Sequence, residues 1–296
     1  MSKKTILNVL GNVKFVIKQI TPPIVISIIK KNKVYIFSRR FISRSVAYKY
    51  TPTWRKITEG ALSGCNFFAD SQGIASNMIA GNYDYFFTDY IKRINLEGKI
   101  IFDIGAHIGF DTLFFAKAVG EKGKVFAFEP NIHNKERLDL IIKHNEHLSG
   151  IISTYDVAIS NKKGNVDFLF DDNIDGGTSS GSFIDDSHTI WEKDVYERDI
   201  GYKRTNVQTI SLDEVSDLGI VEMPALIKID VEGAEFLVIE GAKKLLKNNH
   251  PILLIEIHSI FNMLKVGEDL KELGYKIELL KEEVDGRCFI AATYNN

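Results

Sequence analysis

From Gly98 onward, short apolar runs alternate with amphipathic stretches. Apolar runs of this length are typical of buried strands, and amphipathic stretches between them are typical of crossover helices. Strands are predicted at 99–104, 124–128, 152–158, 225–230 and 251–257. Helices are predicted at 109–119, 133–147, 233–247 and 262–273. The alternation predicts an α/β fold built on a parallel sheet.

The end of the chain predicts two further strands, at 276–280 and 287–293, joined by a hairpin turn at Asp285-Gly286. Such a hairpin would add a reversed edge element to the sheet. The whole pattern predicts a doubly wound, mostly parallel seven-stranded sheet. An insertion at 164–210, with strands at 166–170 and 207–210, is expected to form the acceptor region.

The first 50 residues have a different pattern. Apolar side chains recur at helical spacing from Ile6 to Ile20, and Thr21-Pro22-Pro23 ends that helix. We therefore divide the chain into a basic amphipathic extension, 1–50, and a catalytic domain, 51–296. The aromatic segment 51–93 is interrupted by four glycines and predicts loops and short helices.

Charge is unevenly distributed, although the net charge is only −2. Residues 1–56 contain 13 Lys and Arg and no Asp or Glu. A basic arm of this kind favours an anionic partner such as nucleic acid or a phospholipid surface, and the charge does not distinguish them. The amphipathic pattern of residues 1–45 fits an anchor on an anionic membrane surface. Packing on the body or on a second subunit, as in a homo-oligomer, fits the same pattern equally well.

The compartment is predicted from the cysteines and the apolar runs. Cys65 and Cys288 are too far apart for a zinc motif and indicate no disulfide framework. The longest uncharged stretch of the arm, Gln19 to Ile29, is shorter than the roughly 20 residues of a membrane span. We expect a cytoplasmic protein, with the arm on the inner face of the cell membrane.

The first chemical motif is Asp103-Ile-Gly-Ala-His-Ile-Gly109, between a predicted strand and a helix. A glycine turn at this point lets the backbone approach a nucleotide-like ligand. Gly105, Ala106, His107 and Gly109 are the predicted contacts. The GxGxxG pattern of dinucleotide folds is missing, and Asp103 would repel a phosphate but suit the cationic methionyl end of S-adenosylmethionine (SAM).

The next two strand ends predict the nucleoside contacts. Glu129, followed by Pro130, can accept from both ribose hydroxyls, although an isolated strand-end acid is often only solvated. Asp156 can accept from the adenine amine with Ala158 beside it, although it could equally cap a turn.

Acidic residues follow the fourth and fifth strands, opposite the expected position of the methyl sulfonium. Asp230 and Glu232 come after the fourth, and alternation puts Glu256 and His258 on one side of the fifth. These groups could deprotonate a hydroxyl, and His258 is the best base near neutral pH. Asp230, Glu256 and His258 could instead bind a divalent ion, but no metal is predicted.

Taken together, these blocks resemble the FkbM-type family of class I SAM-dependent methyltransferases. Further matching pieces are Gly177-Thr-Ser-Ser180, Ser211-Leu-Asp213 and Lys228-Ile-Asp-Val-Glu-Gly-Ala-Glu235. The resemblance implies O-methylation of a hydroxyl on a sugar or glycan of a polysaccharide, glycolipid or glycosylated metabolite. The chain departs from the family at His107, where Asn is usual, and at Asp84, where Glu is usual.

Three other functions are compatible with parts of the pattern. An NAD-dependent oxidoreductase is disfavoured by the missing GxGxxG. An RNA methyltransferase would explain the basic arm, but the chain lacks the Asp/Asn-Pro-Pro-aromatic motif of amino-methylating enzymes. A noncatalytic, membrane-associated scaffold would keep the fold without the transfer chemistry.

Overall fold

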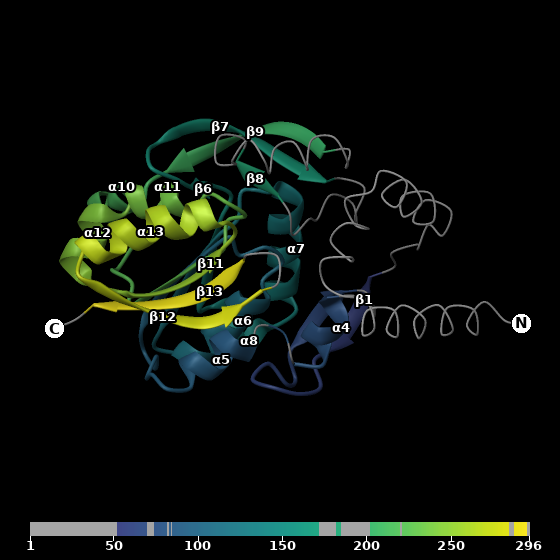
Figure 1. Ribbon diagram of the computed structural model, residues 1–296. Coiled ribbons are helices and arrows are strands. Elements are labelled where there is room, and N and C mark those ends of the chain that lie inside the picture. Colours follow the sequence, from purple (N-terminus) through teal and green to yellow (C-terminus); the bar gives the residue numbers. More distant parts are fainter. Residues whose placement is uncertain are drawn as a thin grey trace, which may run out of the picture. The chain divides into compact units, whose positions relative to one another are not determined.

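The computed structural model describes residues 52–69, 74–81, 83, 85–171, 182–184, 202–219, 221–283 and 287–294. They fall within one compact unit, Thr51–Asn296 (Figure 1). The predicted extension 1–50 and the turn at Asp285-Gly286 lie outside the described residues, as do Asp84 and Gly177-Thr-Ser-Ser180. No helix among the described residues is long and apolar enough to span a bilayer.

A seven-stranded sheet forms the centre of this unit and confirms the predicted fold class. Its order is β12 (Tyr275–Glu282), β13 (Cys288–Tyr294), β11 (Ile252–Ile257), β10 (Leu226–Ile229), β3 (Ile100–Ile104), β4 (Lys124–Phe128) and β5 (Ile152–Tyr155). The five strands from β11 to β5 are parallel. The chain order reverses between β3 and β10, the place where ligands bind in doubly wound sheets.

The position of the reversed strand differs from the prediction. β13 is antiparallel to both β11 and β12, so it lies inside the sheet and β12 forms the edge. A hairpin whose second strand pairs with β11 gives this order. The end of β12 and the start of β13 therefore lie beside the carboxyl end of β11, since Cys288 pairs with both Ile257 and Glu282.

Helices cover both faces of the sheet (Figure 1). One face packs against α5 (Tyr85–Ile91), α6 (Phe110–Val119), α7 (Ile132–Lys143) and α8 (Glu146–Ser149). The other packs against α10 (Leu212–Asp217), α11 (Glu235–Glu240), α12 (Lys243–Asn249) and α13 (Ile260–Glu272). Because both faces are buried, the central strands β3 and β10 are apolar except for one buried charged residue in each, Asp103 and Lys228.

Three predicted elements are each divided. The helix expected at 133–147 is two helices, α7 and α8, which are separated at His144 and Asn145. The helix expected at 233–247 is two helices separated at Gly241, where a Cβ would lie 2.2 Å from the carbonyl oxygen of Ser160. The strand expected at 152–158 ends at Tyr155, and β6 (Ala158–Ile159) joins a second sheet.

That second sheet is formed mainly by the insertion. It has the order β6, β9 (Tyr202–Ile210), β7 (Gly164–Asp171) and β8 (Phe183–Ile184). β6 pairs in parallel with β9, which draws the chain away from the central sheet after β5.

The segment before the central sheet contains a hairpin that the sequence did not predict. β1 (Thr53–Lys56) and β2 (Asn66–Ala69) pair antiparallel, and α4 (Ile74–Ile79) precedes α5. The aromatic residues of α5 that are buried, Phe86, Phe87 and Tyr90, pack into the core.

Candidate active site

The turn after β3 packs directly against the end of β10. A Cβ on Gly105, whose φ is 76°, would lie 1.8 Å from the carbonyl oxygen of Asp230, so only glycine fits. His107 has φ 51°. Asn and His are both enriched in this left-handed region, which gives a physical reason why His107 can stand where Asn is usual.

Glu129 is fixed at the end of β4 by three hydrogen bonds. Its Oε2 accepts from the backbone N–H of His107 at 2.8 Å, and its Oε1 accepts from the N–H of Asn131 at 2.9 Å and from Asn134 at 3.2 Å. Burial raises the pKa of Glu129 to about 7, although these hydrogen bonds oppose the shift. Each oxygen keeps lone-pair capacity for a ligand hydroxyl.

A cavity of about 430 Å³ opens at this edge of the sheet, within the range of about 300–1,000 Å³ typical of small-molecule sites. Nine of the thirteen predicted site residues line it: Gly105, Ala106, His107, Glu129, Pro130, Ala158, Asp230, Glu232 and Glu256. The structure therefore brings the two predicted ends of the site, cofactor and acceptor, into one cavity.

Four predicted site residues do not line the cavity: Asp103, Gly109, Asp156 and His258. The Oδ2 of Asp103 accepts from Thr112 at 2.5 Å, and its carboxylate has no solvent exposure. A Cβ on Gly109 would lie 2.3 Å from Leu138, so this glycine serves helix packing. Asp156 is exposed, and its neighbours Val157 to Ile159 form the cavity wall instead.

Lys228 lies behind the cofactor turn and was given no role by the sequence analysis. Its Nζ donates to the carbonyl oxygen of Gly105 at 2.9 Å. The same nitrogen is 3.5 Å from carboxylate oxygens of Asp103 and Asp230 and 3.9 Å from one of Asp111. Because the side chain is only 3% exposed, it provides a buried positive charge shared by these three carboxylates.

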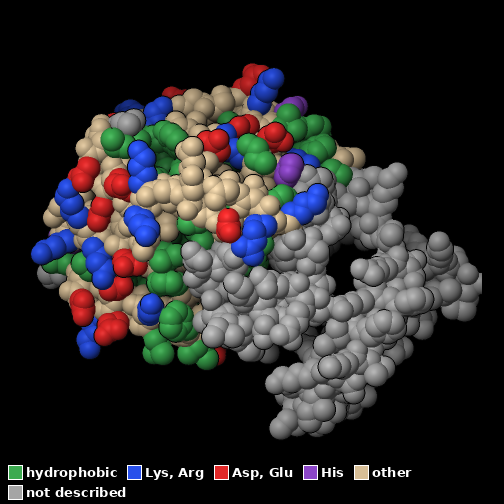
Figure 2. Space-filling view, turned by 90° about the horizontal axis from the view of Figure 1, so that it is seen from above, with side chains coloured by type: hydrophobic (Ala, Val, Ile, Leu, Met, Phe, Trp, Pro, Cys, Tyr) green, Lys and Arg blue, Asp and Glu red, His purple; other side chains and the backbone are tan. Residues whose placement is uncertain are grey.

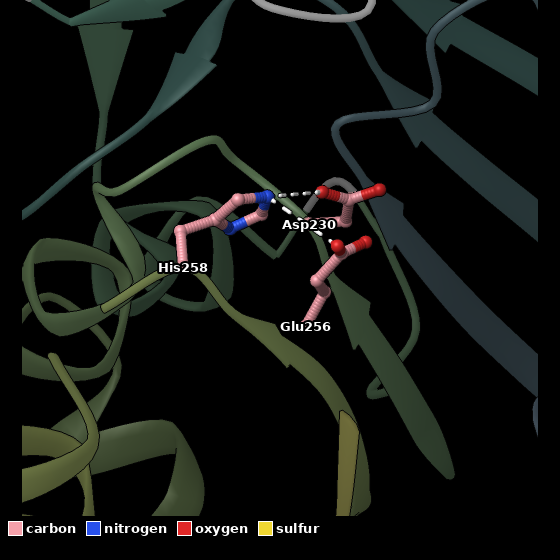
Figure 3. Close-up of side chains that lie close together, drawn as sticks. All are labelled: Asp230, Glu256 and His258. Atoms are coloured by element: carbon pink, nitrogen blue, oxygen red, sulfur yellow. Dashed lines mark ion pairs between the residues drawn. The ribbon is translucent and has the colours of Figure 1, made fainter. Parts of the chain in front are cut away.

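The predicted catalytic groups form one cluster around His258 (Figure 3). Its Nε2 is 3.3 Å from Glu232, 3.6 Å from Glu256 and 3.7 Å from Asp230. Glu232 has φ 53°, a strained backbone for a side chain of this size. The imidazole is 9% exposed, so the cluster is largely removed from water.

Glu235 holds the other side of the imidazole. Its Oε1 is 2.8 Å from Nδ1 of His258 and accepts from the N–H of Gly233 at 2.8 Å. Its Oε2 accepts from Asn262 at 2.6 Å. Glu235 was not among the predicted site residues, yet these contacts fix the orientation of His258.

The protonation states in the cluster follow from burial and charge. Burial opposes a charged imidazole, but the surrounding carboxylates outweigh it and raise the pKa of His258 well above its ordinary value. Burial also raises the pKa of Glu232 and of Glu256, and neighbouring carboxylates add to both shifts. Arg287 donates to Glu256 at 3.1 Å. These shifts favour the imidazolium form of His258.

A divalent cation could be held by the same trio, since ligand atoms of Asp230, Glu256 and His258 lie within 4.8 Å of one another. Imidazole binds metals only in its neutral form. A metal would therefore have to displace the proton of His258.

The other end of the cavity is lined by residues that the sequence analysis did not name as site residues. They are Tyr85 and Phe86 of α5, and Lys281, Glu283, Arg287 and Phe289 of the terminal hairpin. No local motif marks them, because they meet only through the pairing of β12 with β13 and of β13 with β11. Lys228 could have been noticed as a lysine within an apolar strand.

Comparisons with known proteins identify the family of the chain. The family model described as "Methyltransferase FkbM domain" matches residues 103–277, more than half of the chain. The chain is 26% identical over 200 residues to the hexuronic acid methyltransferase AglP of Haloferax volcanii, covering 68% of this chain and 73% of AglP.

Solved structures are similar in outline. A crystal structure described as methyltransferase FkbM from Methylobacillus flagellatus matches with a TM-score of 0.45 and 15% identity, over 65% of this chain and 43% of that chain. A SAM-dependent O-methyltransferase from Thermotoga maritima matches with a TM-score of 0.46 and 12% identity, over 85% of this chain and 81% of that chain. On the family match, the chain belongs to the FkbM family of methyltransferases.

Proposed function

We propose that this methyltransferase moves the methyl group of SAM to a hydroxyl of a sugar. The observation that carries the proposal is the position of Asp230. Its backbone carbonyl touches the cofactor turn at Gly105, and its side chain faces Glu256 and His258 on the acceptor side. One residue thus lies where a methyl donor and an acceptor would meet.

The residues at the cofactor end fit SAM. The fixed carboxylate of Glu129 suits the two ribose hydroxyls, and the apolar wall from Val157 to Ile159 suits the adenine. Asp111 lines the cavity beside Lys228, where the zwitterionic methionyl end would lie. Asp103 would act through Lys228 and not by direct contact. Bound SAM would supply an electrophilic methyl group.

We assign the proton transfer to Asp230. An attacking hydroxyl must lose a proton as its oxygen bonds to the methyl carbon. His258 already holds a proton, and burial favours the protonated form of Glu256. Asp230 lines the cavity with 26% of its side chain exposed, and the imidazolium lies 3.7 Å away. Much of the rate enhancement would come from alignment of the two substrates.

A sugar acceptor is supported by the relative AglP, whose name gives a hexuronic acid as its substrate. The family match supports methyl transfer without identifying an acceptor. The RNA alternative gains no support from the face seen in Figure 2, where described side chains of both charge signs are interspersed.

The test uses purified full-length protein, labelled SAM and a panel of methyl glycosides of hexoses and hexuronic acids. Methylated product should form with at least one glycoside. It should survive mild alkali, as an ether does and a methyl ester does not. Asp230→Asn should lower kcat by about 10²–10⁴-fold, while Asp89→Asn, at an exposed site on α5, should retain full activity.

Binding of SAM without transfer to any glycoside would contradict the proposal. A noncatalytic scaffold would give that result. Full activity of Asp230→Asn would leave the enzyme but remove our assignment of the base.

A further inference from the structure

The acceptor end of the cavity combines one exposed aromatic ring with one fixed ion pair. Tyr85 is 55% exposed, whereas Phe86, Phe87, Tyr90 and Ile91 of the same helix are buried. Its ring contacts the edge of Phe86, with centroids 5.6 Å apart. An exposed ring that lines a cavity offers a flat apolar surface to a ligand.

The ion pair is formed by Lys281 and Glu283, whose Nζ and Oε1 are 2.6 Å apart. The pairing of β12 with β13 shifts register between Leu279 and Lys281. Bulges of this kind redirect side chains beside functional sites. Here Lys281 and Glu283 both line the cavity, and each side chain is 30% exposed.

Aromatic rings fix the ammonium group of Lys281. Its Nζ lies 4.9 Å from the centroid of Phe86, 5.5 Å from that of Phe289 and 5.8 Å from that of Tyr85. Cation–π contacts at these distances hold the ammonium beside the exposed ring. The donor, the acceptor and the apolar surface therefore keep a defined relation to one another.

We propose that the acceptor's sugar ring packs its apolar C–H face on Tyr85, while Lys281 and Glu283 hydrogen-bond to two adjacent hydroxyls of that ring. An ammonium only donates and a carboxylate only accepts, whereas a hydroxyl does both. A donor and an acceptor side by side therefore match a vicinal diol. The reacting hydroxyl would be another one, directed toward Asp230.

This subsite rests on the proposed function, since it concerns how that function selects its acceptor. It assigns acceptor specificity to the ring and the ion pair rather than to the insertion 164–210. Sugar rings that lack either of the two neighbouring hydroxyls are therefore expected to bind poorly.

The experiment measures KM and kcat for the best methyl glycoside, and the dissociation constant of S-adenosylhomocysteine by calorimetry. Tyr85→Ala, Lys281→Met and Glu283→Gln should each raise the acceptor KM by about tenfold or more. The affinity for S-adenosylhomocysteine should be unchanged. Tyr85→Phe, which keeps the ring, and Lys276→Met, at an exposed site on β12, are the matched controls.

Deoxy analogues of the same glycoside provide the second readout. The analogue that lacks the hydroxyl bound by Lys281 should bind weakly to the wild type and should lose little more affinity in Lys281→Met. Wild-type KM values in all three variants would overturn the subsite and leave the proposed function standing.

If the wild type transfers no methyl to any glycoside, the proposed function fails and the subsite is judged by binding alone. Saturation-transfer NMR on the protein with S-adenosylhomocysteine should then show the ring C–H protons of a glycoside receiving magnetisation, and Tyr85→Ala should abolish the effect. Absence of transfer from the wild type overturns the subsite.

Discussion

Glu235 and His258 are joined through Oε1 and Nδ1 at 2.8 Å, and Glu235 has no solvent exposure. Because Nδ1 is held by Glu235, Nε2 is the ring nitrogen that faces Asp230, Glu232 and Glu256. A carboxylate behind a histidine commonly sets its tautomer and orientation. The state of the catalytic cluster therefore depends on a buried residue that no substrate would touch.

Glu235→Gln should lower the pKa of His258, because one of the carboxylates that raise it is removed. The wild-type imidazolium stabilises the fold fully below about pH 6.5, and this contribution is lost as the pH rises through the folded-state pKa. The variant should therefore lose most stability in acidic and neutral buffer and least in alkaline buffer. NMR titration of the ring and urea unfolding measure both effects.

The control for Glu235→Gln is Glu240→Gln, at the exposed end of the same helix. It should leave the titration of His258 unchanged. An unaltered titration in Glu235→Gln would contradict the role given to this residue.

Lys228→Met should lower the free energy of unfolding by about 3–5 kcal/mol, because it leaves Asp103 as an uncompensated buried charge. Lys124→Met is a useful comparison, since Lys124 is exposed on β4 of the same sheet and its ammonium group donates to the backbone carbonyl of Gly150. Urea unfolding would reveal the difference. A loss below about 1 kcal/mol in Lys228→Met would show that the three carboxylates do not need this cation.

Glu129→Gln should weaken binding of S-adenosylhomocysteine by about 10–100-fold, since a single carbonyl oxygen cannot replace both carboxylate oxygens. The pKa of about 7 adds a pH test. Because the ionised form is the better acceptor, wild-type affinity should rise as the pH passes through about 7, and the variant should lose this rise. Calorimetry at several pH values measures the affinity of both proteins for S-adenosylhomocysteine. The control is Glu136→Gln, on the exposed face of α7.

Activity should survive treatment with EDTA. The imidazolium of His258 and the guanidinium of Arg287 already compensate the carboxylates that a divalent ion would bridge. The assay compares initial rates after chelation and after addition of Mg²⁺ or Mn²⁺. A rate that disappears with EDTA and returns with metal would instead identify the trio in Figure 3 as a metal site.

The lining of the cavity at the ends of β3 and β4 could be predicted because it depends on short sequence motifs. A glycine turn after an apolar strand, and an acid at the end of the next, predict where backbone and carboxylate will lie. Burial and facing direction were harder to predict. Asp103 and Asp156 both follow the expected pattern, yet the first is buried behind Lys228 and the second is exposed.

The acceptor half could not be predicted because it depends on distant pairings. Tyr85 meets Lys281 only because β13 inserts between β11 and β12. The role of Glu235 depends equally on His258, 23 residues away along the chain. The break at Gly241 also depends on a residue far away in the sequence. The backbone carbonyl of Ser160 lies where a side chain at position 241 would have to be.

Much of the proposed acceptor end of the cavity comes from the terminal hairpin, a segment separate in sequence from the residues that would hold the methyl donor. Most residues that would hold the methyl donor lie between Gly105 and Ile159, and β10 and its end add Lys228 and Asp230. Four residues of the proposed acceptor end, Lys281, Glu283, Arg287 and Phe289, lie within nine consecutive positions. Recombination in this short segment could change the acceptor while leaving the donor pocket intact. Exchanging residues 281–289 between family members would be a direct route to enzymes with altered acceptor preference.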